Sequence, residues 1–368
     1  MNPQLIRFRT RQVLKHIDGI LLAQIIILLL VSTAVVYSAS GESMERLIGH
    51  VTNILVGLIV LVVVANVPPH ILAKLGPPLY GLGILLLIGV ALFGEVRNGS
   101  RRWLNLGFGA IQPSELLKIA LPLMLAWYFQ RRAGILRLKD FFVAALLVVV
   151  PLLLILRQPD LGTAILIAAS GFYLLFFAGL PWKIIAALAV AVGAFLPVAW
   201  NMMHDYQRQR ILTLFDPGSD PLGAGYHIIQ STIAIGSGGL LGKGWMEGTQ
   251  SRLDFIPERT TDFVFAVFGE EFGLLGGILL VLLYLGIVVR GLLIASRGAT
   301  LFARLMAGVI SLNLFTCVFV NMGMVSGILP VVGVPLPLMS YGGTAMLTLM
   351  IGFGILMSMA THRKLLKT

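Results

Sequence analysis

Two ionisable residues, Glu115 and Lys118, lie three positions apart just after Pro113, at the start of an apolar segment. On a helix this spacing puts both side chains on one face. Ionisable groups inside a membrane are costly, and they usually face the protein interior or a water-filled cavity. The pair therefore indicates either a polar cavity that binds a charged headgroup or a structural ion pair, and the spacing leaves both interpretations open.

Two aspartates stand where helices are expected to begin. Asp262 follows the turn 257–261, and Asp160 follows Pro159. A partly buried carboxylate with a raised pKa can act as a general base, but aspartate is also a preferred N-cap residue. The position of Asp262, taken alone, favours the cap. For Asp160 the alternatives are an N-cap and a second carboxylate that lines an outward cavity.

Arg101 and Arg102 precede Trp103 in a short polar segment, 95–113. Paired guanidinium groups suit a phosphate or diphosphate, because their donors match its oxygens bidentately. The alternative is that these side chains anchor the chain at a membrane interface beside the tryptophan. The two interpretations are about equally supported by the residue types.

Two further acids, Glu270 and Glu271, lie deeper in the helix expected after residue 262. They need an internal partner, and Lys118 or a backbone site are the candidates. The glycine-rich stretch 236–244 does not fit a phosphate-binding loop, because Gly244 stands where the pattern needs Ser or Thr. We expect a flexible turn there.

Ser340 opens the run Ser-Tyr-Gly-Gly, whose small residues permit either close helix packing or an unwound segment beside a cavity. The six histidines and the single cysteine, Cys317, show no metal-ligand spacing. No cofactor is therefore evident, and the involvement of a divalent cation stays an open question.

The elements that must position these residues are membrane helices. Of 368 residues, 58% are hydrophobic and only 12% charged, whereas soluble domains carry about a quarter charged residues; the mean hydropathy is +0.94. Apolar segments of about the length that crosses a bilayer predict an all-α polytopic membrane protein. There are ten of them: 17–38, 47–67, 77–94, 114–129, 141–156, 161–179, 183–203, 262–289, 303–327 and 340–361.

The basic residues predict the orientation of these segments. The net charge is +11, and Lys and Arg recur in alternate loops, whereas most Asp and Glu fall in the others. Positive loops stay on the cytoplasmic side, so we expect an even number of spans and both termini in the cytoplasm. The basic surplus then reflects topology and anionic lipid rather than nucleic acid.

The whole chain, 1–368, is expected to form a single transmembrane domain with one large external loop, 204–261. Loops of this length are usually functional or disordered. This one contains Tyr226, Ile228 and Trp245, so we expect it to be ordered, with a short helix at 228–235 that lies on the membrane.

Five dispersed motifs resemble those of one family, the SEDS proteins (shape, elongation, division and sporulation), and they occur in order along essentially the whole chain. No motif position departs from the family pattern, and the stretches 216–227 and 248–251 resemble the elongation branch rather than the division branch. The motifs are Asn98-Gly-Ser-Arg-Arg-Trp-Leu-Asn-Leu-Gly107, Gln112-Pro-Ser-Glu-Leu-Leu-Lys118, Gln158-Pro-Asp-Leu-Gly-Thr163, Thr261-Asp-Phe-Val-Phe-Ala266 and Pro337-Leu-Met-Ser-Tyr-Gly-Gly343.

The resemblance implies a glycosyltransferase that polymerises lipid II, an undecaprenyl-diphosphate-linked disaccharide-pentapeptide, into β-1,4-linked glycan strands at the periplasmic face of the bacterial cytoplasmic membrane. Asp262 matches the family's essential aspartate, which changes the balance from helix cap to general base. The positions of Glu115, Lys118, Asp160 and Ser340 match the polar cavity. The implied partners are a class B penicillin-binding protein, which is a transpeptidase, and the elongation machinery.

Arg101 and Arg102 would neutralise the charge of the leaving diphosphate, an inference from chemistry rather than from the family pattern. Two rival hypotheses are a lipid II flippase and a non-enzymatic scaffold for the transpeptidase. A flippase needs polar groups through the full bilayer depth, whereas most ionisable residues of this chain lie in the outer half. A scaffold would not need Glu115, Lys118 or Asp262.

Overall fold

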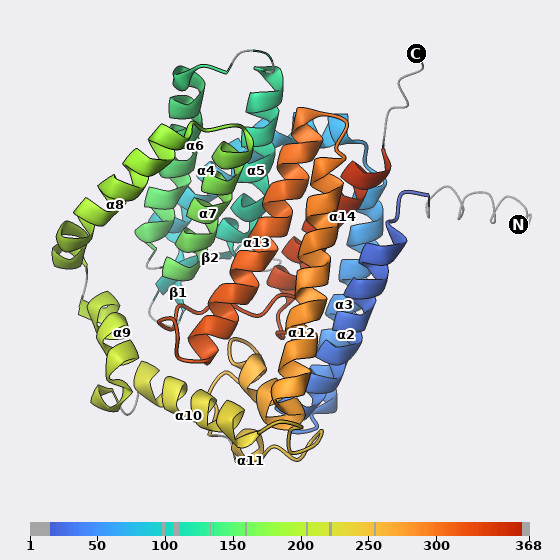
Figure 1. Cartoon of the computed structure of the whole chain (residues 1–368), viewed down its shortest axis with the longest axis vertical. Helices are drawn as coiled ribbons and strands as arrows, with labels where there is room; N and C mark the ends of the chain where they lie inside the picture. Colours follow the sequence, from blue (N-terminus) through green and yellow to red (C-terminus); the bar gives the residue numbers. More distant parts are fainter. Residues whose placement is uncertain are drawn as a thin grey trace, which may run out of the picture.

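The computed structural model describes residues 15–97, 100–105, 110–132, 134, 136–158, 160–203, 205–220, 223–253 and 255–362. Its long helices form one bundle (Figure 1) and coincide with the ten predicted segments. They are α2 (Gly19–Ala39), α3 (Met44–Ala65), α4 (Pro69–Phe93), α5 (Pro113–Arg131), α6 (Leu138–Leu156), α7 (Leu161–Phe177), α8 (Trp182–Met202), α12 (Val264–Ser296), α13 (Leu301–Val325) and α14 (Gly343–Thr361).

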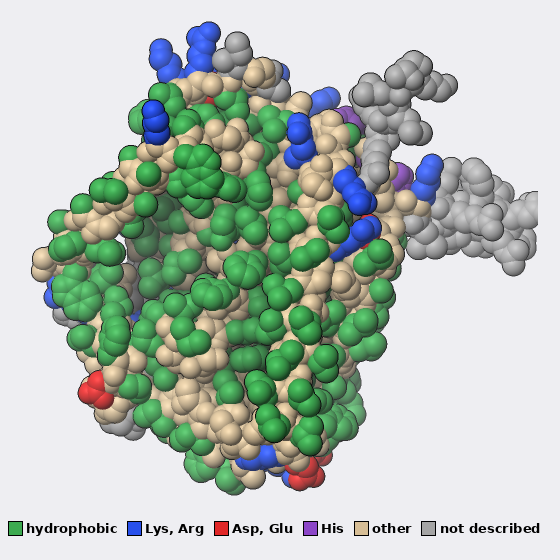
Figure 2. All heavy atoms as spheres, viewed as in Figure 1, with side chains coloured by type: hydrophobic (Ala, Val, Ile, Leu, Met, Phe, Trp, Pro, Cys, Tyr) green, Lys and Arg blue, Asp and Glu red, His purple; other side chains and the backbone are tan. Residues whose placement is uncertain are grey.

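Among the described residues, seven helices are long and apolar enough to cross a membrane: α2, α3, α4, α6, α12, α13 and α14. The other three depart from that pattern for different reasons. The first turns of α5 carry Glu115 and Lys118, α7 is short, and α8 is described without a gap in its side chains only from Trp182 to Val198. Hydrophobic side chains cover the sides of the bundle (Figure 2). The protein is an integral, polytopic, helical membrane protein.

Two helix boundaries differ from the prediction by more than three residues. The start predicted at Pro77 is wrong, because α4 begins at Pro69 and carries Pro77 and Pro78 in its interior. Prolines inside membrane helices are tolerated where neighbouring helices support the freed backbone groups, and α4 packs along α5. The end predicted at Val289 is also wrong: α12 continues through Arg290, whose charge is neutralised by Asp18, Nη2 to Oδ2 2.5 Å.

A small antiparallel sheet of order β1-β2-β3 is the one addition to the all-α prediction. Its strands are β1 (Glu95–Arg97), β2 (Ser100–Asn105) and β3 (Ala110–Ile111). The β2 strand pairs with β1 on one side and with β3 on the other, where Leu104 lies opposite Ile111. Because β3 leads directly into α5, the sheet fixes the arginine-containing segment against the start of that helix.

The segment 204–261, which the sequence predicts to be external (the external segment), is ordered over its described residues, as predicted. It contains α9 (Asp205–Phe215), the 3-10 turn η1 (Pro217–Ser219), α10 (Ala224–Ser237) and α11 (Thr249–Arg252). The short helix expected at 228–235 lies within α10, whereas α9 was not predicted. These elements lie at the end of the bundle opposite the two termini (Figure 1).

The glycine-rich stretch forms a turn, as predicted, and this turn docks on α12. At Gly273 the helix is interrupted, with φ +63° and ψ −162°, a conformation open essentially only to glycine. The turn satisfies the backbone groups near this break. Leu274 N donates to Gly239 O at 2.9 Å, and Lys243 N donates to Glu270 O at 3.0 Å.

The same contact supplies a partner for the buried Glu270, whereas the buried Glu271 has its partner on α2. The Glu270 carboxylate accepts from Lys243 Nζ at 2.7 Å and from the backbone N–H groups of Gln250 and Ser251 at 2.9 and 3.2 Å. Glu271 accepts from the hydroxyl of Ser38 on α2. The prediction of Lys118 as their partner is wrong, and the alternative of a backbone site is confirmed for Glu270.

Gly273→Ala should destabilise the protein. A Cβ atom there would lie 2.3 Å from Gly242 N, and the left-handed backbone adds strain on the order of 1–3 kcal/mol. Gly277→Ala is the matched control, because it lies in the regular part of α12 and its Cβ would meet nothing within 4 Å. Thermal unfolding in detergent should show a lower Tm for the first variant only. Equal Tm values would contradict the role given to the break.

Candidate functional site

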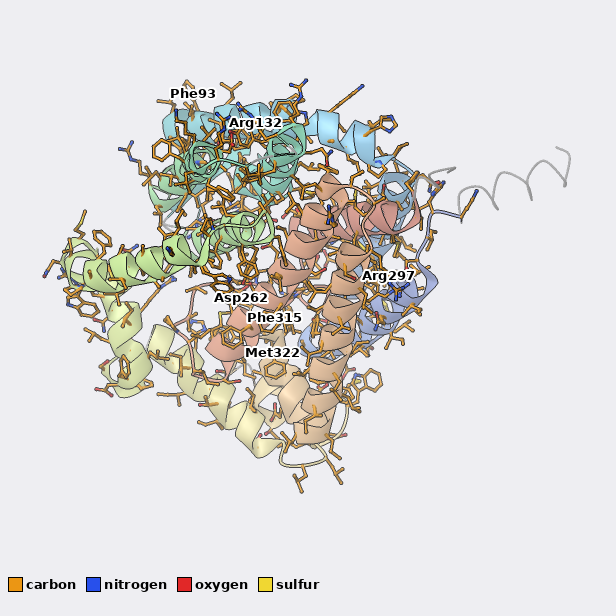
Figure 3. The ribbon with its side chains drawn as sticks, turned by 45° about the horizontal axis from the view of Figure 1, so that its top comes forward. Phe93, Arg132, Asp262, Arg297, Phe315 and Met322 are labelled. Atoms are coloured by element: carbon orange, nitrogen blue, oxygen red, sulfur yellow. The ribbon has the colours of Figure 1, made fainter. Side chains whose placement is uncertain are left out.

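A polar cavity of about 260 Å³ lies where β2 and the first turns of α5, α7 and α14 meet two loop segments. One loop contains Thr261 and Asp262, and the other runs from Gly333 to Gly342. Asp262 lies toward the middle of the molecule rather than at its rim (Figure 3). The polar lining residues are Arg102, Trp103, Gln112, Glu115, Lys118, Asp160, Thr163, Thr261, Asp262, Ser340, Tyr341 and Thr344.

Asp262 does not cap α12. The N-cap position belongs to Phe263, and no side chain forms a capping hydrogen bond there. The expectation that Asp262 serves as a helix cap is therefore wrong, because the turn continues one residue further than the Thr-Thr-Asp pattern suggests. No described residue donates a hydrogen bond to the Asp262 carboxylate, which opens into the cavity.

The surroundings of Asp262 change its acidity. Burial, and next the negative charge of Glu258, raise the pKa of Asp262 to about 6, while the positive charge of Arg102 acts in the opposite direction. A carboxylate with this pKa is mostly ionised at neutral pH and is still basic enough to accept a proton efficiently. The site therefore contains a free, activated carboxylate.

Glu115 and Lys118 form an ion pair with 2.5 Å between Oε1 and Nζ, so the predicted placement on one helix face is confirmed. Both residues line the cavity, which means that the two interpretations of the pair are not exclusive. The second carboxylate oxygen of Glu115 is buried without a hydrogen-bond partner among the described residues. The pair thus contributes one ammonium group and one partly unsatisfied carboxylate to the site.

Asp160 is the N-cap of α7, where its carboxylate accepts from Thr163 N at 3.1 Å. The same side chain accepts from Gln112 Nε2 at 3.3 Å and lies 3.8 Å from Arg102 Nη1. The structure therefore combines both interpretations of Asp160: it caps a helix and faces the cavity beside a cation. Arg101 is the next residue along β2, but its side chain lies outside the described part of the structure.

Ser340 lines the cavity, although its hydroxyl group is already used within the protein. It donates to Thr261 O at 2.6 Å and accepts from Leu336 N at 2.8 Å. The next residue, Tyr341, donates its N–H to Thr260 O at 2.8 Å. These bonds tie the segment of the Ser-Tyr-Gly-Gly motif to the residues just before Asp262.

Sequence reasoning missed Asn321 and Gln112. Asn321, on α13, is fully buried, and its Nδ2 donates to the carbonyl oxygens of Asp262 and Val334 at 2.8 and 2.7 Å. The available signal was an amide side chain in a mostly apolar helix, which also contains Asn313. Gln112 belongs to a motif already noted, but only the structure shows its bond to Asp160. Among the described residues, no group of three or more His, Cys, Asp or Glu side chains fits a metal ion.

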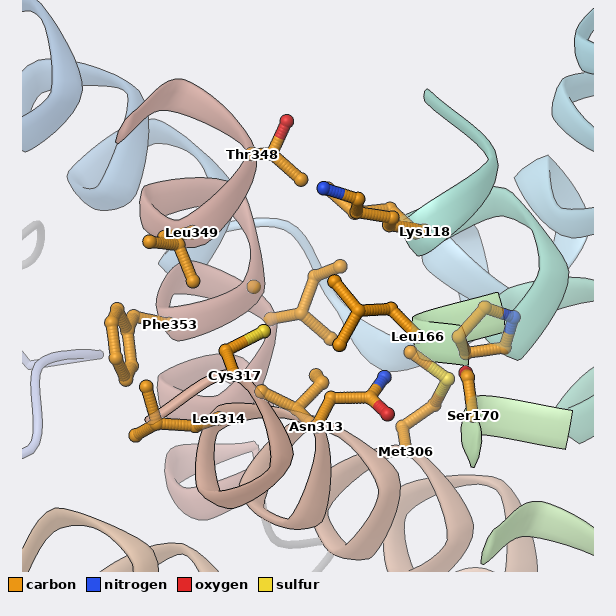
Figure 4. A pocket seen from close by; sticks show the side chains of 15 residues that line it. Lys118, Leu166, Ser170, Met306, Asn313, Leu314, Cys317, Thr348, Leu349 and Phe353 are labelled. Carbon is orange, nitrogen blue, oxygen red and sulfur yellow. The ribbon is translucent and has the colours of Figure 1, made fainter. Parts of the chain in front are cut away.

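A second, smaller cavity of about 80 Å³ lies next to the first, within the helix bundle. Lys118 borders both cavities, and in the close view its ammonium group lies near Thr348 (Figure 4). Beyond this point the lining is mostly apolar, with Met306, Leu314 and Phe353 among its residues. The polar lining of the first cavity therefore gives way to hydrophobic packing.

Comparisons with known proteins show the family of the chain. A family model described as "Cell cycle protein", covering FtsW, RodA and SpoVE, matches residues 13–365. The peptidoglycan glycosyltransferase MrdB of Escherichia coli K12 is 54% identical over 355 residues, 95% of each chain. A chain of a peptidoglycan synthase complex that coordinates polymerisation and crosslinking superposes with a TM-score of 0.80 at 35% identity, over 92% of this chain and 96% of the other.

The fold of a named relative is also similar. The crystal structure of the rod shape determining protein RodA of Thermus thermophilus gives a TM-score of 0.71 at 28% identity, over 94% of this chain and 98% of that one. The family match covers nearly every residue, and the sequence and structural relatives agree with it. The chain therefore belongs to the SEDS family, the cell cycle proteins that include FtsW, RodA and SpoVE.

Proposed function

We propose that this membrane enzyme, a peptidoglycan glycosyltransferase of the elongation type, joins lipid II units at the periplasmic face of the cytoplasmic membrane. The observation that carries the proposal is the Asp262 carboxylate, which accepts no hydrogen bond from the described residues and shares a cavity with Arg102 and Lys118. A free base beside two cations suits a reaction in which a hydroxyl loses a proton while a diphosphate leaves.

In the proposed step, Asp262 accepts the proton of an acceptor GlcNAc 4-hydroxyl. That oxygen attacks the anomeric carbon of the donor, the bond from this carbon to the diphosphate oxygen breaks, and a β-1,4 linkage forms with inversion. The undecaprenyl diphosphate departs with the bonding electrons. The leaving group carries the energy of the reaction, which suits a site outside the cytoplasm, where soluble nucleotide sugars are absent.

The cations act on the leaving group. Arg102 and Lys118 neutralise the growing charge of the diphosphate, and Arg101 keeps the same proposed role on the ground of its residue type alone. Asp160 and Glu115 hold these cations by ion pairing. Ser340 acts on the substrate side of the cavity mainly by holding the backbone before Asp262.

The proposed topology has ten spans, with both termini in the cytoplasm. Lys and Arg side chains gather at the end of the molecule where the chain termini lie (Figure 2), as the preference of positive loops for the cytoplasm requires. The elements α9 to α11 then lie in the periplasm. A class B penicillin-binding protein is the proposed partner, since the similar complex couples polymerisation with crosslinking.

A flippase is less well supported. Transport of a diphosphate headgroup needs polar groups along the whole path, whereas the cavity next to Lys118 is mostly apolar over its described lining. A scaffold without catalysis leaves the buried charges in the cavity unexplained. The glycosyltransferase accounts for both the polar outer cavity and the apolar inner packing.

Asp262→Asn should abolish polymerisation. The amide keeps the shape of the side chain but accepts no proton, and the loss of a general base costs about 10²–10⁴-fold in rate. The measurement is glycan-strand formation from purified lipid II in detergent, with the transpeptidase partner present. Glu247→Gln, an exposed acid of the external segment, is the control and should keep wild-type activity. Strands made by Asp262→Asn at the wild-type rate would disprove the assignment.

The pH dependence of the reaction provides a second test. The pKa of Asp262 is raised to about 6, and the base works only when deprotonated. Activity should therefore fall as the pH decreases through about 6. The charge of Glu258 contributes to the raised pKa, so Glu258→Gln should move this acidic limb to lower pH. An unchanged limb in that variant would show that another group controls it.

The ion pair between Glu115 and Lys118 permits a test of its two interpretations. Breaking a buried pair leaves an uncompensated charge, whereas removing both partners is often tolerated. If the ammonium group acts on the diphosphate, Lys118→Met and the double variant Glu115→Gln/Lys118→Met should both lose about 10²-fold in kcat/KM. Recovery of activity in the double variant, measured with the same lipid II assay, would make the pair purely structural.

A further inference from the structure

His50 is a buried polar residue that the proposed reaction does not use. It lies on α3, a membrane-spanning helix, and its side chain is completely buried. Its Nε2 atom lies 2.8 Å from the hydroxyl oxygen of Ser32 on α2, another fully buried polar residue. The Ser32 hydroxyl is also within 3.1 Å of the carbonyl oxygen of Met339. Three distant parts of the chain therefore meet at one hydroxyl group.

The geometry determines how the protons are arranged. A hydroxyl group has a single hydrogen, and Ser32 donates it to Met339 O. The contact with His50 must then be a bond in which Nε2–H donates to Ser32 Oγ. The Nδ1 atom is left as an acceptor without a partner among the described residues, which is less costly than an unpaired buried N–H. His50 thus acts as a donor of one directed hydrogen bond.

This bond reaches the site through Met339 and the two residues that follow it. Ser340 Oγ donates to Thr261 O, and Tyr341 N donates to Thr260 O. Both acceptors immediately precede Asp262 in the chain. The hydrogen bonds therefore run without a gap from α3 through α2 and the 339–341 segment to the backbone that carries the catalytic carboxylate.

The face of α3 around His50 also seats Tyr341. The two rings lie 6.0 Å apart, and the neighbouring Gly49 has no side chain, since a Cβ atom there would lie 2.9 Å from the Tyr341 hydroxyl oxygen. Tyr341 itself lines the cavity. Helix α3, which contributes no residue to the cavity lining described above, thus supports one of its walls from behind.

We infer that His50 is a positioning residue for the reaction. Through Ser32 and the 339–341 segment it holds Asp262 within hydrogen-bonding reach of the acceptor hydroxyl. The Asp262 carboxylate has no hydrogen bond of its own from the described residues, so its position depends on the main chain on both sides of it. Small displacements of a catalytic group lower the rate strongly. This inference rests on the proposed function of Asp262.

Two amide substitutions of His50 test whether the hydrogen bond to Ser32, rather than the polarity of the side chain, matters for the rate. In His50→Gln the side-chain amide nitrogen can take the place of Nε2 and donate to Ser32, whereas the shorter amide of His50→Asn cannot reach it. We expect kcat for lipid II polymerisation to fall about tenfold in His50→Asn, the loss that one neutral hydrogen bond represents, with KM changed less than about twofold. His50→Gln should restore most of kcat. His70→Asn, at the exposed start of α4, is the control.

Ser32→Ala gives an independent test, because it removes the hydroxyl and leaves the histidine. It should reduce kcat by a similar factor, and the double variant Ser32→Ala/His50→Asn should be no slower than either single variant, since residues in one network are not additive. Thermal unfolding measurements identify variants that have lost their fold. Such a loss would lower the amount of active enzyme to a similar extent in His50→Asn and His50→Gln.

Wild-type kcat in His50→Asn, equal losses in the Asn and Gln variants, or additive losses in the double variant would overturn the inference. These outcomes differ from a failure of the proposed function, in which the wild-type protein with its partner would make no glycan strands at all.

Discussion

Asn321 makes the contact on which the polar cavity around Asp262 depends. Its side chain is fully buried in α13, and one amide nitrogen donates to the backbone carbonyls of both Asp262 and Val334. These carbonyls belong to the two loop segments that line the cavity. In a bilayer, irregular backbone is tolerated only where protein or a polar cavity satisfies it. A single amide donor meets that requirement for two loops at once and thereby fixes their separation.

The charges in the cavity are arranged so that only one acid remains free. Asp160 is committed to the cap of α7 and to Arg102, and Glu115 is committed to Lys118. Asp262 alone accepts no hydrogen bond from the described residues, and burial raises its pKa to about 6. Removing the ion pairs would give the site several competing bases, whereas removing the burial would return Asp262 to an ordinary acid. The proposed chemistry therefore follows from a difference between the three carboxylates: two have hydrogen-bond or ion-pair partners, and one has none among the described residues.

The sequence predicted the helices and most residues of the cavity, because hydropathy and charge are local properties. Errors arose where a distant contact decided the outcome. The start of α4 was misplaced because its interior prolines are supported by α5, and the partner of Glu270 was missed because Lys243 approaches from the external segment. The cap assigned to Asp262 failed for a related reason: the turn before α12 is held by Ser340 and Asn321 rather than by its own side chains. No local pattern contains that information.

The helix α12 connects the external segment to the site. Its first residue, Val264, lies two positions after Asp262, Glu270 anchors the external segment through Lys243 two turns later, and the break at Gly273 receives the glycine-rich turn. A buried glutamate and a broken helix are both costly in a membrane. Here the external segment supplies partners for both, since Lys243 pairs with Glu270 and Gly239 O accepts from Leu274 N beside the break. The external segment and the turn that carries Asp262 are therefore held by one short stretch of helix. A protein that displaced the external segment would therefore act on the stretch of α12, 264–273, that directly follows the turn with Asp262.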